Sequence, residues 1–347
     1  MVKLTNSKNQ SALINEIQWK GHEGIRFLAG GYEALIIPEV GANVIELKDN
    51  IRNLSLLRTP DDSLEFEAFK ERPQVYGLPL LFPPNRIEDG NFKIGNKIYQ
   101  FPINEPKNNN YIHGFIKNEK WIVTRKEIID GNKAQVEAIF NFTKEHDFYK
   151  YFPHEFQAKL VYILSDKGLK QITSITNLSG EKMPIGIGFH TAFNVPFHPE
   201  SKDEDCRLIA SIDKRWEQDE RNLPTERILD LTEDEKKYLN TGIMPLGYKI
   251  ESHYTLKPMN IKAGDFNGAI IEDTSKGLRV VYEMGKKYRH MVVWNDMGDK
   301  HYVCIEPQSW VINAPNIKLD DSITGFKTLE PGENWSEMCG ICVEEIS

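Results

Sequence analysis

Residues 158–176 read AKLVYILSDKGLKQITSIT and contain two segments of alternating or β-branched residues, 158–164 and 171–176. Between them lies Asp166-Lys167-Gly168, a combination that is typical of the tight turn of a β-hairpin. An alternation with period two turns successive side chains toward opposite faces of a sheet. This stretch therefore predicts two antiparallel strands joined by a short turn.

The same pattern recurs along the chain, in short segments bounded by Gly, Asn, Asp or Pro. Further strands are predicted at 34–37, 121–124, 278–283, 290–294 and 338–343. Two more hairpin turns are predicted, one at Asp130-Gly131-Asn132 and one at Gly285-Lys286-Lys287-Tyr288, between the strands 278–283 and 290–294. Strands that follow one another through tight turns favour antiparallel pairing.

Helix is scarce by comparison. Asp61-Asp62-Ser63 predicts the cap of a short helix that runs through Phe69, and Thr232-Glu233-Asp234-Glu235 has the form of a capping box. Because helices do not alternate with the strands, a parallel sheet with helical crossovers is not expected. The sequence predicts an all-β fold, a large antiparallel β-sandwich with a few short helices, in one domain that spans residues 1–347.

Composition narrows the possible partners. The chain has 347 residues and a formal net charge of −8. An acidic chain without a long Lys/Arg run is a poor match for nucleic acid or for anionic membranes. The first ten residues do not resemble a signal peptide, and no stretch approaches the roughly 18 apolar residues of a membrane span. A soluble, cytoplasmic protein is expected.

The four cysteines fit that compartment. Cys339-Gly340-Ile341-Cys342 has the spacing of a metal or redox motif, but no second Cys or His pair supplies the other ligands of a zinc site. The motif lies within the strand predicted at 338–343, where positions three apart point to opposite faces. Structural cysteines are expected, and neither a metal nor a cofactor is predicted.

Glu306 is the first candidate for chemistry. It follows the apolar segment Tyr302-Val303-Cys304-Ile305 and precedes Pro307. A carboxylate is costly to bury without a partner, and proline does not continue a central strand. Glu306 is therefore expected at a strand end that faces a pocket. His113, in Ile112-His113-Gly114, and His190, in Gly188-Phe189-His190, complete a possible acid–base set.

These residues lie in motifs that resemble those of the aldose 1-epimerase family, the galactose mutarotases. The resemblance extends from about Gly77 to Glu333, with Ala192 in place of the family's usual tyrosine. The matching segments are Asn85-Arg86-Ile87, Gly90-Asn91-Phe92, Gly95-Asn96-Lys97-Ile98-Tyr99, Ile112-His113-Gly114, Trp121, His190-Thr191-Ala192-Phe193-Asn194, Glu306-Pro307-Gln308, Asn313-Ala314-Pro315-Asn316 and Leu329-Glu330-Pro331-Gly332-Glu333.

The resemblance implies a galactose mutarotase-like supersandwich with a monosaccharide pocket on its concave face. It implies that Glu306 is the general base and His190 the general acid in a ring opening that interconverts the anomers of an aldose. Arg86 and His113 would hold the sugar, and Asp265 would be the family's sugar-binding aspartate. Unperturbed pKa values near 4 and 6.5 suit a carboxylate beside an imidazolium.

Two other functions stay open at this level. A hexose-phosphate 1-epimerase is suggested by Val292-Val293-Trp294-Asn295, with Lys286, Lys287 and Arg289 as candidate phosphate contacts. A non-catalytic sugar-binding protein of the same fold would keep the pocket without turnover, although binding alone requires no acid–base pair. A glycoside hydrolase fits less well, because that chemistry usually needs two carboxylates that flank the bond.

Overall fold

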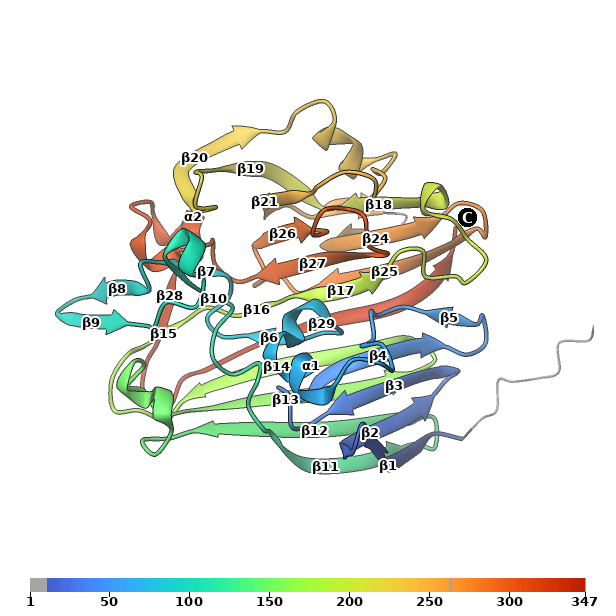
Figure 1. Ribbon diagram of the computed structural model, residues 1–347, viewed down its shortest axis with the longest axis horizontal. Helices are drawn as coiled ribbons and strands as arrows, with labels where there is room; N and C mark the ends of the chain where they lie inside the picture. Colours follow the sequence, from blue (N-terminus) through green and yellow to red (C-terminus); the bar gives the residue numbers. More distant parts are fainter. Residues whose placement is uncertain (1–10, 262–263, 347) are drawn as a thin grey trace, which may run out of the picture.

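The hairpin predicted at 158–176 is formed by β13 (Phe156–Ser165) and β14 (Gly168–Asn177). The structure is a computed structural model that describes residues 11–261 and 264–346. The described strands pair only in antiparallel ladders, so the all-β antiparallel prediction is confirmed. Figure 1 shows these strands stacked as broad sheets, with little helix.

Three larger sheets contain most of the strands. The first eight-stranded sheet has the order β11 (Ile122–Ile129), β12 (Lys133–Phe142), β13, β14, β29 (Asn334–Glu345), β25 (Leu278–Met284), β24 (Gly268–Asp273) and β18 (Cys206–Ala210). The second has the order β20 (Pro224–Asp230), β19 (Ile212–Gln218), β21 (Glu251–Leu256), β26 (His290–Trp294), β27 (Tyr302–Gln308), β16 (Gly188–Phe189) and β6 (Leu80–Leu81), with β17 (Thr191–Asn194) also paired to β27. The five-stranded sheet runs from β1 (Leu13–Trp19) through β2 (His22–Ala29), β3 (Tyr32–Ile37) and β4 (Asn43–Asp49) to β5 (Leu54–Ser55).

Four strand pairs and several single-turn helices complete the described elements. The pairs are β7 (Arg86–Glu88) with β10 (Asn110–Ile112), β8 (Asn91–Ile94) with β9 (Lys97–Gln100), β15 (Met183–Ile185) with β28 (Lys327–Leu329), and β22 (Met259–Ile261) with β23 (Gly264–Phe266). The helices are α1 (Phe66–Glu71), α2 (Asp321–Thr324) and the 3₁₀ turns Pro73–Val75, Pro106–Asn108, Asp147–Lys150, Asp203–Asp205, Glu235–Leu239 and Ala314–Asn316.

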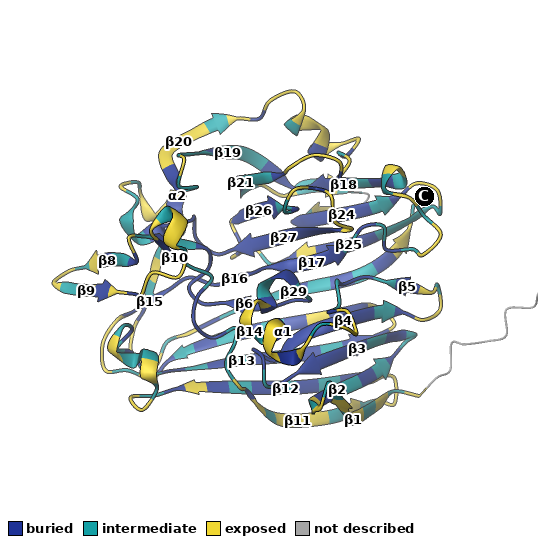
Figure 2. Ribbon diagram, viewed as in Figure 1, coloured by how far each residue is buried: buried dark blue, intermediate teal, exposed yellow. Residues whose placement is uncertain are grey.

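One apolar core joins the two eight-stranded sheets. Phe193 on β17 packs on Tyr282 on β25 with ring centroids 5.3 Å apart, and the Tyr282 hydroxyl lies 2.9 Å from the Thr191 hydroxyl. Phe115 and Trp310 belong to the same buried cluster. In Figure 2 the strands β24 and β27 are almost wholly buried, while the edge strands β1 and β11 have many exposed positions. The sandwich is therefore held by burial of facing apolar surfaces.

The third predicted hairpin is wrong. β25 pairs with β24 and β29 in one sheet, whereas β26 pairs with β21 and β27 in the other. The segment 285–289 is therefore a crossover between the two sheets. A hairpin and a crossover between sheets have the same local sequence signature, a short connection with glycine between two apolar segments. Which strands pair is decided by the part of the core that each strand covers.

The helix predictions hold in part. The helix predicted to begin after Asp61-Asp62-Ser63 is α1, which begins only at Phe66 and has no side-chain cap. The capping box is formed, because the Glu235 carboxylate accepts from the Thr232 backbone N–H and the Thr232 hydroxyl accepts from that of Glu235. It precedes a 3₁₀ turn rather than an α-helix. Among the described residues, every helix is too short or too polar to pass through a bilayer.

The two cysteines of the CxxC segment lie on β29 and point to opposite faces, as predicted. Cys339 is buried in the main core, whereas Cys342 packs against a separate apolar cluster with Ile209, Ile270 and Val281. All four cysteines are free thiols. Across the described part of the chain, no group of three His, Cys, Asp or Glu side chains is arranged to hold a metal ion.

Candidate active site

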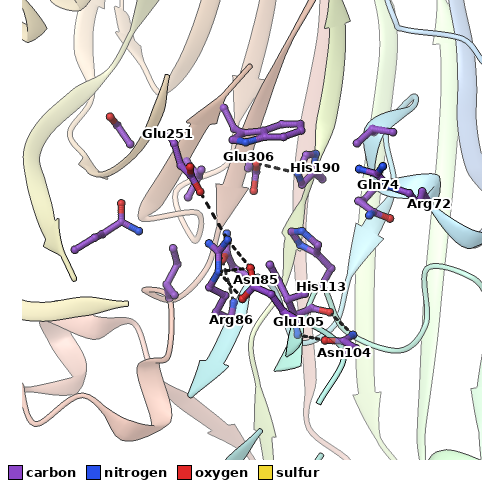
Figure 3. Close-up of a pocket in the computed structure, with 17 residues that line it drawn as sticks. Arg72, Gln74, Asn85, Arg86, Asn104, Glu105, His113, His190, Glu251 and Glu306 are labelled. Atoms are coloured by element: carbon purple, nitrogen blue, oxygen red, sulfur yellow. Dashed lines mark hydrogen bonds and ion pairs between the residues drawn. The ribbon is translucent and has the colours of Figure 1, made fainter. Parts of the chain in front are cut away.

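A cavity of about 320 Å³ lies over β19, β21, β26 and β27, and the segment around β7 and β10 lines another side of it. That volume is at the lower end of the range for small-molecule sites. Four of the five predicted site residues line it: Arg86, His113, His190 and Glu306. Figure 3 shows the Glu306 and His190 side chains facing each other in this cavity.

Glu306 lies within β27 and not at its end. The strand continues through Pro307 to Gln308, and Glu306 is opposite Val292 on β26. On the other flank the ladder skips two pairs without a shift of register, because Thr191 lies opposite Ile305 and Gly188 lies opposite Gln308. Pro307 therefore sits where the ladder on that flank is broken, which explains how a central strand accommodates it.

His190 occupies that interruption, between β16 and β17. Its Nε2 lies 3.1 Å from Oε1 of Glu306, and both side chains are almost completely buried. Within the described residues, His190 Nδ1 and Glu306 Oε2 have no further hydrogen-bond partner. The shared register of β16 and β17 with β27 places His190 opposite Glu306, and this brings the imidazole and the carboxyl together. Among the described residues, the second ring nitrogen and the second carboxyl oxygen stay free for a substrate.

Burial governs the protonation of the pair. Loss of hydration lowers the pKa of His190 to about 3, and it raises the pKa of Glu306 well above its ordinary value. The structure therefore favours a neutral carboxylic acid beside a neutral imidazole, in place of the ion pair that unperturbed values predict. Both arrangements contain one proton, which can move across the 3.1 Å contact.

His113 approaches the pair from the other side. Its ring is perpendicular to that of His190 at a centroid distance of 5.1 Å, and Trp294 packs edge-on against His190 at 5.5 Å. His113 has a left-handed backbone with φ of 64°, and its N–H donates to the Asn85 carbonyl at 3.0 Å. Burial lowers the pKa of His113 well below its ordinary value, so this ring is neutral near pH 7.

The following residue makes this turn possible. Gly114 also has a left-handed φ, of 64°, and a Cβ at this position would lie 2.4 Å from the Phe82 carbonyl oxygen. Only glycine fits such a close approach of two backbone segments. The His113-Gly114 sequence therefore fixes the place of the His113 ring in the cavity wall.

Arg86 is held by carboxylates. Its Nε and Nη2 donate to Glu105 at 3.0 and 2.9 Å, and Nη2 lies 3.7 Å from Glu251. Both glutamates line the cavity, and neither was predicted from the sequence. Glu105 precedes a proline in an irregular segment and Glu251 begins β21, so neither has a local signal that separates it from a surface carboxylate.

Asp265 is not brought to this site. It is exposed on β23 and lines a different cavity, of about 520 Å³, together with Lys286 and Arg289. The prediction that Asp265 contacts a sugar beside Glu306 is therefore corrected: the acidic side chains in the Glu306 cavity are Glu105 and Glu251. Lys287 lines a third cavity, also with Lys286 and Arg289, so the three candidate phosphate contacts lie outside the Glu306 cavity.

Comparisons with known proteins identify the family and the fold. Residues 25–341 match the family model described as aldose 1-epimerase. A galactose mutarotase-like protein from Clostridium acetobutylicum is 58% identical, with a TM-score of 0.95 over 97% of this chain and 100% of that chain. Protein LacX (chromosomal) from Lactococcus lactis is 26% identical over 259 residues, which are 72% of this chain and 79% of LacX. Galactose 1-epimerase from Lactobacillus acidophilus, 17% identical, shares the fold with a TM-score of 0.69 over 97% of this chain and 99% of that chain.

Proposed function

This chain belongs to the aldose 1-epimerase family, and we propose that it is an isomerase that interconverts the α and β anomers of a free aldose. The observation that carries the proposal is the contact of 3.1 Å between His190 Nε2 and Glu306 Oε1 in a polar cavity. A pair that holds one proton can accept a proton at one atom while it donates one at another. Opening a pyranose ring requires both transfers.

The steps follow from that pair. When the shared proton moves from Glu306 to His190, a carboxylate and an imidazolium result. The carboxylate accepts the proton of the anomeric hydroxyl, the imidazolium protonates the ring oxygen, and the C1–O5 bond breaks to give the free aldehyde. Rotation about C1–C2 exposes the other carbonyl face, and the reverse transfers close the ring as the other anomer. Each proton transfer typically contributes about 10²–10⁴-fold in rate.

The remaining polar side chains supply orientation. Arg86 has N–H groups that Glu105 does not use, and these can donate to sugar oxygens. Glu251 can accept a hydrogen bond from a sugar hydroxyl, the role that the resemblance assigns to an aspartate. A bound sugar reacts faster when hydrogen bonds fix its orientation toward the catalytic pair before the reaction.

The test is polarimetry on freshly dissolved α-glucose and α-galactose, with glucose 6-phosphate followed by NMR. We expect faster mutarotation of at least one neutral aldose, and a loss of at least about 100-fold in Glu306→Gln. Asp265→Asn is the matched control, because it removes an exposed carboxylate from a different cavity.

Each alternative has its own outcome. Activity confined to glucose 6-phosphate would favour the hexose-phosphate epimerase. Sugar binding without acceleration would favour the non-catalytic protein. Glu306→Gln with the wild-type rate would rule out the assigned base.

A further inference from the structure

Arg86 is engaged before any substrate is considered. Glu105 accepts from Nε of Arg86 with Oε1 at 3.2 Å and Oε2 at 3.0 Å, and from Nη2 with Oε1 at 2.9 Å. This is the edge-on, forked geometry in which arginine binds a carboxylate most strongly. The two side chains are 12% and 19% exposed, so solvent screens the pair only weakly.

Glu105 is itself held in position. Asn110 donates through Nδ2 to Glu105 Oε2 at 2.9 Å, and its Oδ1 accepts from Arg221 at 3.1 Å. Arg221 also pairs with Asp89 at 2.7 Å and donates to the Asn108 carbonyl at 2.9 Å. The Glu105 carboxylate is thus fixed from behind by a network that reaches the protein surface.

The charges around Arg86 cancel. Its single positive charge lies beside two carboxylates, Glu105 in direct contact and Glu251 at 3.7 Å, and Glu251 also pairs with Lys249 at 2.7 Å. The His190–Glu306 pair with one shared proton has no net charge in either arrangement. A phosphate brought to the Arg86 side of the cavity would therefore meet a guanidinium already paired and two carboxylates that repel it. Arg72, the other guanidinium of the lining, is exposed to solvent.

We propose that Glu105 is a specificity-determining residue: it orients the Arg86 guanidinium and neutralises its charge, so that the cavity accepts neutral aldoses and discriminates against anionic sugars. The proposal rests on the proposed function in that it assumes a sugar in this cavity. Outside the Glu105 contact, Nη1 of Arg86 donates one N–H to Asn85 Oδ1 at 3.4 Å. Its second N–H can donate to a hydroxyl oxygen, which needs a donor but no net charge.

The test measures binding rather than turnover. Dissociation constants for galactose, glucose and glucose 6-phosphate are determined by ligand-observed NMR for the wild type and for Glu105→Gln. The amide keeps the shape and one acceptor but removes the charge, so the affinity ratio of glucose 6-phosphate to glucose should rise at least about tenfold. Glu105→Asp, which keeps the charge, should stay closer to the wild-type ratio.

The matched control is Glu181→Gln. Glu181 is an exposed carboxylate that also pairs with a cation, Lys97, but it does not line the cavity. Glu181→Gln makes the net charge of the chain one unit less negative, as Glu105→Gln does, and should leave the affinity ratio unchanged. A folded Glu105→Gln with the wild-type ratio would overturn the proposal, as would a wild type that binds glucose 6-phosphate as tightly as glucose.

Failure of the two proposals can be told apart. A wild type that binds glucose without accelerating mutarotation would refute the proposed catalysis, and a raised ratio in Glu105→Gln would still support the role of Glu105. If the wild type accelerates mutarotation but Glu105→Gln has the wild-type affinity ratio, the proposed catalysis is supported and the role of Glu105 is refuted.

Discussion

The His190–Glu306 contact joins a carboxyl group, which ionises to an anion in water, and an imidazole, which ionises to a cation. Each is buried, so each loses hydration of its charged form, and the neutral arrangement is favoured in both. The ion pair differs from this arrangement by the movement of one proton over a short contact. Apparent pKa values measured by activity therefore belong to the pair and not to either residue.

This coupling predicts the pH profile. The form with one proton persists between the lowered pKa of His190, about 3, and the raised pKa of Glu306. With unperturbed values the same form would be lost as pH rises above about 6.5. We expect kcat/KM for mutarotation, after subtraction of the uncatalysed rate, to stay level from about pH 6.5 to about pH 7.5, where the protein is folded, and to fall on the alkaline side. A profile that declines from pH 6.5 to 7.5 would contradict the shared, buried proton.

At the residue scale, the sequence predicted the residues that belong to compact motifs. His113, His190, Glu306 and Arg86 each lie beside a glycine or proline or in a short ordered segment, and all four line one cavity. Glu251 reaches the cavity by strand register, opposite Trp294 on β26, and register is decided by the whole sheet. Asp265 had a plausible local setting, but its hairpin is directed to another cavity.

At the scale of elements, the site depends on irregularities in regular structure. The gap between β16 and β17 seats His190, and the left-handed turn at His113-Gly114 seats the second imidazole. The sequence predicted the hairpins at Asp130-Gly131-Asn132 and Asp166-Lys167-Gly168 correctly, because turn and strands are contiguous. It did not distinguish a hairpin from a crossover at 285–289, since both begin with an apolar strand and a glycine.

Gly114→Ala tests the left-handed turn. A Cβ would overlap the Phe82 backbone at 2.4–2.7 Å in addition to straining the positive φ. We expect a loss of about 2–5 kcal/mol in unfolding free energy, from about 1–2 kcal/mol of strain and about 1–3 kcal/mol of overpacking, with reduced mutarotation as His113 moves. Urea unfolding followed by fluorescence measures the first effect.

Gly131→Ala is the control for this change. Gly131 has a similar φ of 70° in the β11–β12 turn, but nothing lies within 4 Å of a Cβ there. Gly131→Ala should therefore lower the unfolding free energy by the backbone strain alone, about 1–2 kcal/mol, and leave activity intact. Equal losses in the two variants would show that the close approach to Phe82 does not constrain the turn.

At the scale of the whole molecule, the sandwich buries several titratable side chains, five histidines among them. Burial lowers the pKa of five histidines, to about 4 for His154, to about 3 for His190 and His290, and well below the ordinary value for His113 and His253. His253 lies between Trp216 and His290, and neither of its ring nitrogens has a partner in the described part of the chain. Folding therefore keeps these rings neutral at pH values where the unfolded chain protonates them.

This burial predicts acid sensitivity. The stabilising contribution is complete above the unfolded pKa of about 6.5 and is lost as pH falls toward the folded values, by about 2 kcal/mol per histidine between pH 7 and 5. Glu306, with its raised pKa, acts in the opposite sense and offsets roughly one histidine over that range. Five histidines act in one sense and Glu306 in the other, so the net effect is a loss of stability as pH falls. We expect unfolding free energies from urea titrations to drop steeply between pH 6.5 and 5.

His253→Leu removes one of the buried side chains that take up a proton when the protein unfolds at acid pH. Without it, unfolding takes up one proton fewer below pH 6, so the slope of unfolding free energy against pH should decrease by about 1.4 kcal/mol per pH unit. His301→Gln is the matched control, because His301 is 75% exposed and gains or loses little hydration on folding. If His253→Leu keeps the wild-type slope, as His301→Gln should, His253 does not contribute to the acid sensitivity. That result would contradict the prediction, because removal of a neutral imidazole from the core must reduce the number of protons taken up on unfolding.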